Sequence, residues 1–482
     1  MDLRVVLKLL GHVLIFEALF MLVAAAPSLA YGGWDFEAIM FSVGVTAAFG
    51  LALSKIFGSV ESAFQKREGF VTVSLAWISL ALFGALPYYF AGVHTGFVDC
   101  FFESVSGFTG TGLSVFSDLD ILPKGVLFWR SFTNWLGGMG VLVMVLAIMP
   151  SLRPSAINLL HAESSGPSPG KIVPRIRDTA KIMYKIYVAL TLAQIFALFI
   201  AGMPIYDAIL NTFASAGTGG FSPQNASIGA YNSIPIEVVT GIFIILFGIN
   251  FSLLFCLTQF DFKSFFADEE LRLYLFVIGG AVLLITVDLI SVYGGVGKSL
   301  RYAFFQVATI SSTSGFVSTS LTDWPSLSKA ILLCLMVFGS CAGSTGGGVK
   351  ILRVLVAIKS VRHEITKILH PRLMKNITVN KKTLDTAILN NIYVFFFLFA
   401  SFVVAATFLV ALDTNGLTSA FLVVLSSVSN VGVDINVFGA SLAHSATFSG
   451  FSKFVLSVCM LAGRLEFFPV MILFVPSVWR KG

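Results

Sequence analysis

Charged residues are scarce in this chain. Of its 482 residues, 12% are charged and 56% are hydrophobic, and the mean hydropathy is +0.90. A soluble domain carries roughly 45–50% apolar and about 25% charged residues, and a chain with so few charges would expose too much apolar surface to stay dispersed in water. The composition therefore excludes an ordinary soluble protein and predicts that the chain lies in a lipid bilayer.

Cysteines are also few, and the motifs of several enzyme classes are missing. The five cysteines form no Cys-x-x-Cys pair, and the six histidines lack the spacing of metal ligands. We therefore expect neither a disulfide framework nor a metal centre of cysteines and histidines. The chain has no His-Glu-x-x-His motif, no Gly-x-Ser-x-Gly motif and no pair of carboxylates at membrane depth. These absences argue against a membrane enzyme, and we expect no nucleic-acid partner.

Long apolar stretches, by contrast, are abundant. A helix that spans a membrane needs about 20 mostly apolar residues. The first stretch could be mistaken for a signal peptide, but it is long enough to span and a second follows at once, so we interpret it as a retained anchor. The ten predicted spans lie near residues 5–30, 36–57, 70–93, 126–150, 183–203, 235–258, 272–293, 328–358, 388–412 and 451–478.

Positive charge is unevenly distributed among the connections between these spans. Most of the 31 lysines and arginines gather in alternate connections, and the densest stretch is 350–382. Because cytoplasmic connections of membrane proteins carry an excess of Lys and Arg, this pattern predicts that both termini lie in the cytoplasm. The 350–382 stretch could also attract anionic lipid or an acidic partner surface, or it could serve only as a topological anchor.

The connections on the opposite side each open with a short apolar stretch. These stretches begin near residues 94, 204, 297 and 413. They hold roughly 10–14 residues, which is too short to span and is typical of a re-entrant helix. Each ends in small, hydroxylated and glycine residues. The four segments read VDCFFESVSGFTGTGLS, YDAILNTFASAGTGGFS, RYAFFQVATISSTSGFV and SAFLVVLSSVSNVGVDI.

The four segments align on one glycine, with a large apolar residue ten positions before it. Such self-similarity indicates a repeat of helix, re-entrant helix, loop and helix, which occurs four times after an N-terminal helix pair. The aligned glycines are Gly112, Gly219, Gly315 and Gly432, separated by 107, 96 and 117 residues, and the apolar residues are Phe102, Ile209, Phe305 and Leu422. The predicted units are the helix pair, 1–68, and four repeats, 69–165, 166–265, 266–370 and 371–482.

Irregular backbone at membrane depth is tolerated only where protein buries it or water lines it. Four loops around one axis can present backbone carbonyls that replace the hydration shell of a cation, and glycine lets such a strand adopt positive φ without strain. The negative ends of the re-entrant helix dipoles would also favour a cation. We therefore predict a cation filter; the alternative is a set of turns that serve packing only. The predicted filter residues are Thr109, Gly110, Thr111, Gly112, Ala216, Gly217, Thr218, Gly219, Ser312, Thr313, Ser314, Gly315, Ser429, Asn430, Val431 and Gly432.

A glycine-rich segment interrupts the predicted span 328–358. It consists of Ala342, Gly343, Ser344, Thr345, Gly346, Gly347 and Gly348. It is not a nucleotide-binding P-loop, because that motif needs Lys directly after its second glycine and here Val349 follows Gly348. Flexible, polar backbone at this depth must line a cavity. A simple helix kink is the alternative.

Arg464 lies inside the last apolar stretch. A charge at this depth costs at least roughly 2.5–3.5 kcal/mol and marks an ion pathway or a paired site. Glu466 follows two residues later, about 200° around a helix, so it is a poor partner within the helix. We predict that Arg464 faces the permeation path and raises the barrier to cations. The alternative is an ion pair with another repeat.

Four acidic residues lie near the predicted filter on its outer side. They are Asp99, Glu103, Asp118 and Asp120. Carboxylates at the mouth of a pore could concentrate cations there. For Asp118 and Asp120, ordinary solvated charges are an equally good interpretation.

The four-loop pattern, with its Thr-Gly-Thr-Gly, Gly-Thr-Gly-Gly-Phe-Ser and Thr-Ser-Gly-Phe sequences, resembles the Trk/Ktr/HKT superfamily of potassium transport proteins. The segments GSCAGSTGGGVKILR (339–353) and AGRLEFFPV (462–470) strengthen the resemblance, which covers nearly the whole chain. The N-terminal helix pair is similar to TrkH-type members. The fourth loop, Ser429-Asn430-Val431-Gly432-Val433-Asp434, departs from the Leu-Gly-Pro-like turn that is more common there.

The resemblance implies an all-α polytopic membrane protein with four pseudo-symmetric repeats around one pore. It further implies K⁺ translocation across the bacterial inner membrane, with K⁺ bound by the filter carbonyls and residues 342–348 acting as an intramembrane gate. The implied assembly is a homodimer with a cytoplasmic TrkA-type ring, which alone binds nucleotide, and no covalent cofactor. A Na⁺-conducting or Na⁺/K⁺ cotransporting relative is the alternative. In the plant branch Ser at the first filter glycine accompanies Na⁺ permeation, so Gly112 favours K⁺.

Overall fold

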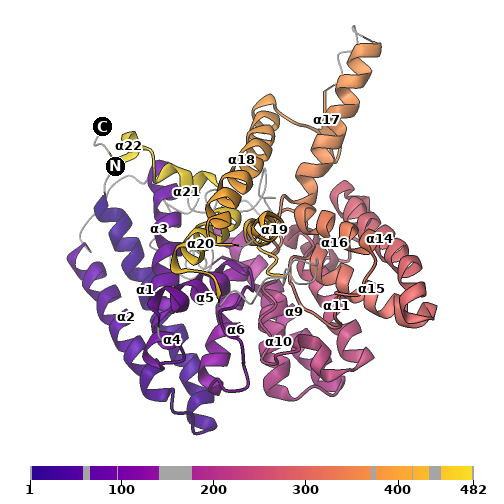
Figure 1. Cartoon of the computed structure of the whole chain (residues 1–482). Coiled ribbons are helices and arrows are strands. Elements are labelled where there is room, and N and C mark those ends of the chain that lie inside the picture. Colours follow the sequence, from indigo (N-terminus) through magenta and orange to yellow (C-terminus); the bar gives the residue numbers. More distant parts are fainter. Residues whose placement is uncertain are drawn as a thin grey trace.

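The computed structural model describes residues 3–57, 66–94, 96–140, 176–370, 376–414, 416–433 and 447–479 (Figure 1). Most of these residues are helical, and turns and loops connect the helices. They also contain a small antiparallel hairpin, in which β1 (Thr378–Val379) pairs with β2 (Lys382–Thr383). The predicted all-α class is therefore confirmed for the described part of the chain.

Within the described residues, six helices are long and apolar enough to cross a membrane. Their exposed side chains are largely apolar, as on α2, where Phe41 and Phe49 are more than half exposed. Such a surface suits contact with lipid rather than water. The six are α1 (Leu3–Ala30), α2 (Phe36–Ile56), the segment Arg67–Phe90 that comprises α3 (Lys66–Gly84) and α4 (Leu86–Phe90), α9 (Ile176–Ile200), α14 (Glu269–Tyr293) and α18 (Thr386–Ala411).

Three of the four helices that follow the predicted filter loops are broken. The sequence predicts the break in the span 328–358, at its glycine-rich segment, but it does not predict the breaks in the spans near 235–258 and 451–478. α11 (Ile234–Phe247) and α12 (Phe251–Thr258) meet at 104°. α16 (Ser326–Phe338) and α17 (Ile351–Leu369) are separated by residues 339–350. α20 (Gly450–Arg464) ends before α21 (Phe468–Ile472). The remaining helix, α6 (Lys124–Gly138), ends early as well, and the rest of that predicted span lies outside the described residues.

Local backbone chemistry explains two of these breaks. Between α11 and α12 the side chain of Asn250 accepts a hydrogen bond from the Ser252 amide at 2.8 Å and so caps a new helix. After α20, Glu466 and Phe467 both adopt positive φ, at 56° and 65°, which no α-helix contains. A hydropathy average over 20 residues does not register either feature.

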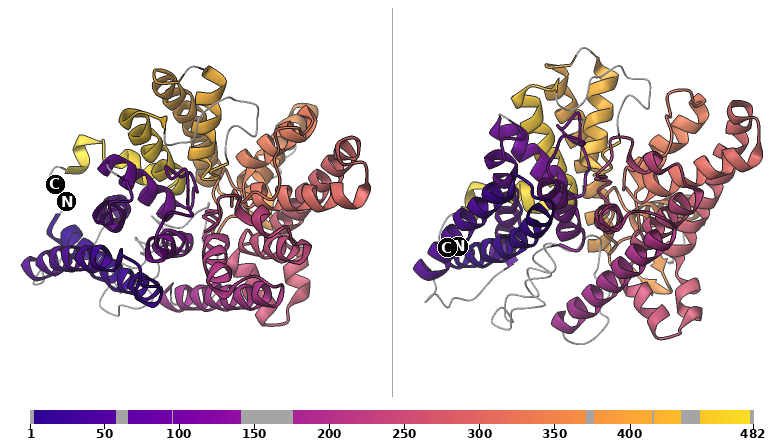
Figure 2. Two further views of the ribbon diagram at one scale, coloured as in Figure 1. Left: turned by 60° about the horizontal axis from the view of Figure 1, so that its bottom comes forward. Right: turned by 90° about the horizontal axis from the view of Figure 1, so that it is seen from below.

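Four short helices lie where the sequence predicts the re-entrant segments, and three of the four fall within the predicted length. They are α5 (Phe97–Thr109), α10 (Ile205–Ala216), α15 (Val296–Ser311) and α19 (Leu417–Val428). With 12 to 16 residues each, they are too short to span a bilayer. Their C-terminal halves are buried. The longer helices are arranged around this central region, and the start of α1 and the short α22 (Pro476–Trp479) lie near one another (Figures 1 and 2).

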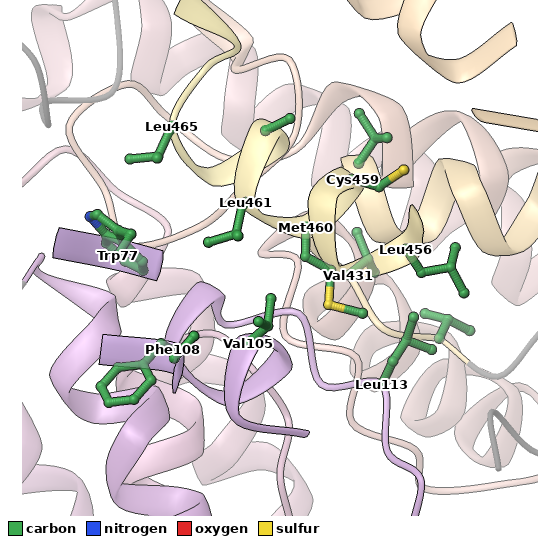
Figure 3. Packing of buried hydrophobic residues seen from close by; sticks show 14 of the residues in the cluster. Trp77, Val105, Phe108, Leu113, Val431, Leu456, Cys459, Met460, Leu461 and Leu465 are labelled. Carbon is green, nitrogen blue, oxygen red and sulfur yellow. The ribbon is translucent and has the colours of Figure 1, made fainter. Parts of the chain in front are cut away.

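The core joins the N-terminal and C-terminal parts of the chain. α20 packs on both α5 and α19. Its buried side chains Leu461 and Met460 belong to the same cluster as Trp77 of α3, Phe108 of α5 and Val431 (Figure 3). This packing brings the loop that follows α5 beside the loop that follows α19, although more than 300 residues separate them in the sequence.

Candidate functional site

Each short helix ends in the same backbone pattern. A backbone amide bonds back to the carbonyl five residues earlier, as in a Schellman helix end. These bonds join Thr111 to Ser106, Gly219 to Ala214, Ser314 to Thr309 and Val431 to Ser426, at 3.0, 2.9, 2.8 and 3.0 Å. The residue before each of these amides has positive φ, and these residues are Gly110 (66°), Thr218 (52°), Thr313 (62°) and Asn430 (53°). The residue after it also has positive φ, and these residues are Gly112 (86°), Gly220 (68°), Gly315 (72°) and Gly432 (65°).

This pattern corrects the predicted register of the second loop. Gly220, not Gly219, has positive φ in line with Gly112, Gly315 and Gly432. The equivalent four residues of the second loop are therefore 217–220, and Ala216 is the last residue of α10. Ten residues before Gly220 stands Leu210, which is fully buried as Phe102 and Phe305 are, whereas Ile209 is only half-buried. The sequence held a signal for this register, since Gly220-Phe221 matches Gly315-Phe316.

The four loops contact one another in a closed ring. In each case a glycine lies so close to the backbone of the next loop that a Cβ could not be added. A Cβ built on Gly112 would lie 2.0 Å from the backbone oxygen of Gly219, and one built on Gly220 would lie 2.1 Å from the backbone oxygen of Ser314. A Cβ built on Gly315 would lie 2.2 Å from the backbone oxygen of Val431, and one built on Gly432 would lie 1.9 Å from the backbone oxygen of Thr111. The same four glycines line one cavity of about 310 Å³, together with Arg130, Ser222 and Asn225. The structure thus brings all four predicted loops together.

Polar side chains brace these loops from the side. Asn430 has a left-handed backbone, which asparagine tolerates better than most residues, and its amide nitrogen donates to Thr111 Oγ1 at 2.8 Å and to the Met460 carbonyl at 3.0 Å. The unusual fourth loop is therefore tied to the first loop and to α20. Asp434, which the sequence also singled out, lies outside the described residues.

The predicted gate segment, 342–348, lies against three of the four loops. The Thr345 carbonyl accepts a hydrogen bond from Thr218 Oγ1 at 3.0 Å, and the Gly347 amide donates to Thr313 Oγ1 at 2.7 Å. A Cβ on Gly347 would lie 2.5 Å from the Ser429 carbonyl oxygen. The segment is more than a helix kink, because it forms a separate, buried turn against the inner ends of these loops.

The other side of this segment is held by neighbouring helices. The Phe251 amide donates to the Gly343 carbonyl at 3.1 Å, at the bend between α11 and α12. The buried carboxylate of Glu270, in the first turn of α14, accepts from the amides of Ala342 at 2.6 Å and Leu352 at 3.1 Å. Lys350 donates to the Gly346 carbonyl. The segment is thus anchored at both ends by hydrogen bonds.

Arg464 reaches this segment from the end of α20. Its guanidinium donates to the carbonyls of Thr345, Gly137 and Gly138 at 2.7, 2.6 and 2.6 Å. The last two carbonyls belong to the end of α6, where helix carbonyls lack helical partners and carry negative dipole charge. Glu466 pairs instead with Arg353 of α17, whose guanidinium lies 3.8 Å from the centre of the Phe395 ring.

The acidic residues of the outer side have specific partners. The Asp99 carboxylate lies 2.5 Å from Lys453 Nζ. Asp118 and Asp120 both accept hydrogen bonds from the Asn225 side chain, at 2.8 and 3.1 Å, and the bond from Asn225 lowers the pKa of Asp118 below its usual value. Glu103 is fully buried against Arg130. The prediction that Glu103 attracts cations at the mouth is therefore wrong, because Arg130 neutralises it.

These features define a class: an α-helical membrane protein in which four short helices direct four glycine-containing loops into one ring. Residues 37–481 match the TrkH family model, described as "Cation transport protein". The chain belongs to this TrkH family of cation transport proteins, and it is a multi-pass membrane protein.

Known relatives match most or all of the chain. The "Trk system potassium uptake protein TrkH" of Salmonella typhimurium (strain LT2) is 34% identical over 487 residues, which cover 100% of both chains. The "Trk system potassium uptake protein TrkG" of Escherichia coli (strain K12) is 33% identical over 425 residues, 86% of each chain. The crystal structure of the potassium transporter TrkH from Vibrio parahaemolyticus matches with a TM-score of 0.88 at 31% identity, again over 100% of both chains.

Proposed function

We propose that this protein conducts K⁺ across the bacterial inner membrane through the ring of four loops. The observation that carries the proposal is the ring of contacts in which each of the four glycines packs against a backbone carbonyl of the next loop. The order of helix, re-entrant helix, loop and helix recurs around this ring, which supports four pseudo-symmetric repeats about one pore. The Trk relatives at 33–34% identity are named potassium uptake proteins.

The proposed filter comprises residues 109–112, 217–220, 312–315 and 429–432. Backbone carbonyls of these residues replace water around a dehydrating K⁺ ion, and left-handed residues turn the strand without side-chain strain. The C-terminal ends of the four short helices add negative dipole charge at the same place. K⁺ is the transported substrate, held by backbone oxygens alone.

Residues 342–348 act as the gate below this filter, and Arg464 raises the barrier to cations there. Their direct contact, between Arg464 and the Thr345 carbonyl, supports a joint role. Opening requires the segment to move away from the inner ends of the loops, so that it alternates between two arrangements.

The gate is controlled from the cytoplasm by a nucleotide-binding TrkA-type ring, and the protein acts as a homodimer with both termini in the cytoplasm. One ion pair and one hydrogen bond support a route by which the cytoplasmic side controls the gate. Lys359 of α17 pairs with Glu269, and the Asn380 side chain of the hairpin binds Asp268 at 2.6 Å. Both acceptors stand directly before Glu270, which holds the gate segment.

Ion flux into liposomes tests the proposal. Purified protein should carry radioactive Rb⁺ into liposomes, and external K⁺ should compete with this uptake far better than Na⁺. Liposomes without protein give the background. Equal competition by Na⁺ would favour the Na⁺-conducting alternative, and the absence of any cation flux, with and without the cytoplasmic partner, would contradict the proposal.

A further inference from the structure

A buried ion pair lies beside the outer end of the first loop. Glu103 of α5 and Arg130 of α6 approach to 2.6 Å, and their side chains are 0% and 4% exposed. Burial removes both charges from water, and the cost of this desolvation often exceeds the attraction that the pair regains. A contribution to overall stability therefore explains this buried pair poorly, and its contacts with the backbone indicate a different role.

Glu103 holds the chain that leaves the first loop. Its Oε1 accepts a hydrogen bond from Ser114 Oγ at 3.0 Å, and its Oε2 accepts one from the Val115 amide at 2.9 Å. Ser114 and Val115 follow Gly112 by two and three residues. The position of this strand therefore depends on a carboxylate that is itself fixed by Arg130.

Arg130 holds the corresponding part of the second loop. Its Nη1 donates to the Ser222 carbonyl at 3.2 Å, and its guanidinium lies 3.6 Å from the centre of the Phe221 ring. The neighbouring Ser131 donates to the Phe221 carbonyl at 3.1 Å. Phe221 and Ser222 directly follow Gly220. One ion pair thus connects the strands that leave two adjacent loops.

The other repeats lack this charge. In the corrected register Glu103 stands nine residues before Gly112, and the corresponding residues before Gly220, Gly315 and Gly432 are Asn211, Gln306 and Val423. Between the second and third loops, the described contacts are neutral: Val317 donates to Ser227 Oγ at 3.3 Å and accepts from the Gly229 amide at 3.1 Å. An ion pair therefore braces the boundary between the first and second loops, whereas neutral hydrogen bonds brace the boundary between the second and third.

We propose that Glu103 and Arg130 are positioning residues that set the ion selectivity of the ring by fixing the spacing between the first and second loops. The proposal rests on the proposed function. A filter that discriminates by the number and placement of its carbonyls depends on restraints around them. Without the pair, Gly112 and the Gly219 carbonyl are free to separate or slide, and the ring then accommodates Na⁺ as well as K⁺.

Two variants test the pair. Glu103→Gln removes the carboxylate charge, and Arg130→Lys keeps the positive charge but loses the planar contact with Phe221 and the second donor toward Ser222. The readout is the ratio of Rb⁺ to Na⁺ uptake into liposomes, with thermal stability and oligomeric state measured in parallel. We expect the ratio to fall by about tenfold in Glu103→Gln and by a smaller factor in Arg130→Lys.

A second ion pair provides the matched control. Arg301 of α15 bonds Glu237 of α11 through two nitrogens, each at 2.7 Å, and Glu237 is buried to a similar degree as Glu103. Neither residue lines the cavity at the ring. Glu237→Gln should therefore lower thermal stability while leaving the Rb⁺ to Na⁺ ratio as in the wild type.

The outcomes separate this inference from the function on which it rests. A wild-type protein without Rb⁺ preference would overturn both. A selective wild type, with folded Glu103→Gln and Arg130→Lys proteins that keep the same ratio, would overturn the positioning role alone, as would an equal loss of selectivity in Glu237→Gln. If Glu103→Gln does not fold, Arg130→Lys, which keeps both charges, decides the question by the same ratio.

Discussion

The guanidinium of Arg464 donates a hydrogen bond to the carbonyl oxygen of Thr345 at 2.7 Å. The same group binds the carbonyls of Gly137 and Gly138 at the end of α6. The Arg464 guanidinium therefore connects α20 with the predicted gate and with α6, the helix that follows the first loop. This arrangement places positive charge next to the gate segment, among backbone dipoles that favour it.

Replacement of Arg464 by Ala should raise K⁺ flux. The change removes a charge that repels cations where screening is weak, and it also releases the Thr345 carbonyl. We expect an increase of about tenfold, which corresponds to about 1.4 kcal/mol off the barrier. Rb⁺ uptake into liposomes measures the effect. Arg464→Lys, which keeps the charge, is the control and should stay slow, and a folded Arg464→Ala protein with unchanged or lower flux would show that Arg464 is only structural.

Replacement of Gly112 by Ser should reduce the preference for K⁺ over Na⁺ by about tenfold. Its Cβ would lie 2.0 Å from the Gly219 carbonyl oxygen, at a φ of 86°, so the backbone of two loops must shift. Gly279→Ser in α14 is the matched control, since a Cβ there meets nothing within 4 Å. Competition of Rb⁺ uptake by Na⁺ gives the preference. If Gly112→Ser folds and keeps the wild-type preference, Gly112 is not a filter residue.

The corrected register of the second loop predicts that Gly220→Ala harms selectivity more than Gly219→Ala. A Cβ on Gly220 would lie 2.1 Å from the backbone oxygen of Ser314, at positive φ. A Cβ on Gly219 would meet the Asn134 side chain at 2.5 Å, and a side chain can move where backbone cannot. The same competition assay compares the two proteins. Equal effects, or a larger effect at Gly219, would support the register first inferred from the sequence.

The sequence predicted the short helices well because they depend on local composition, and it predicted the convergence of their loops from the repeated pattern. An apolar stretch that is too short to span, followed by glycine at membrane depth, is compatible with few structures other than a re-entrant helix and its loop. The register of the second loop was harder, since Gly219 and Gly220 are adjacent and either fits a one-glycine alignment. The φ values and the helix-end hydrogen bond distinguish them, and the match of Gly220-Phe221 to Gly315-Phe316 is the signal in the sequence that agrees with them.

Two other features left no local trace in the sequence. The break after α20 carries Phe467, an apolar residue that keeps the hydropathy high although its φ is positive. The ion pair of Glu103 and Arg130 joins two helices, and the pair of Arg353 and Glu466 joins residues 113 positions apart. Such pairs follow from how the helices pack in space, which hydrophobic periodicity does not specify.

Shortening of the segment 342–348 should give high K⁺ flux that no longer depends on the cytoplasmic partner. The described contacts indicate what is lost: the hydrogen bonds from Thr218 to the Thr345 carbonyl and from Gly347 to Thr313, and the contact with Arg464. The contacts that close the ring run between the loops themselves, as between Gly112 and Gly219. The ring should therefore persist without the segment, while the constriction below it is removed.

Loss of the segment is not without a structural cost, because Thr345 is fully buried and Ala342 is bonded to Glu270. The shortened protein must therefore be shown to be folded and dimeric before its flux is interpreted. A milder variant, Glu270→Gln, weakens one anchor without removing any backbone and should raise flux by a smaller factor. Low flux in a folded, shortened protein would contradict the gate assignment. High flux with no preference for K⁺ over Na⁺ would mean that the segment supports the filter from below, since the bonds to Thr218 and Thr313 would then be needed to hold the loops in place.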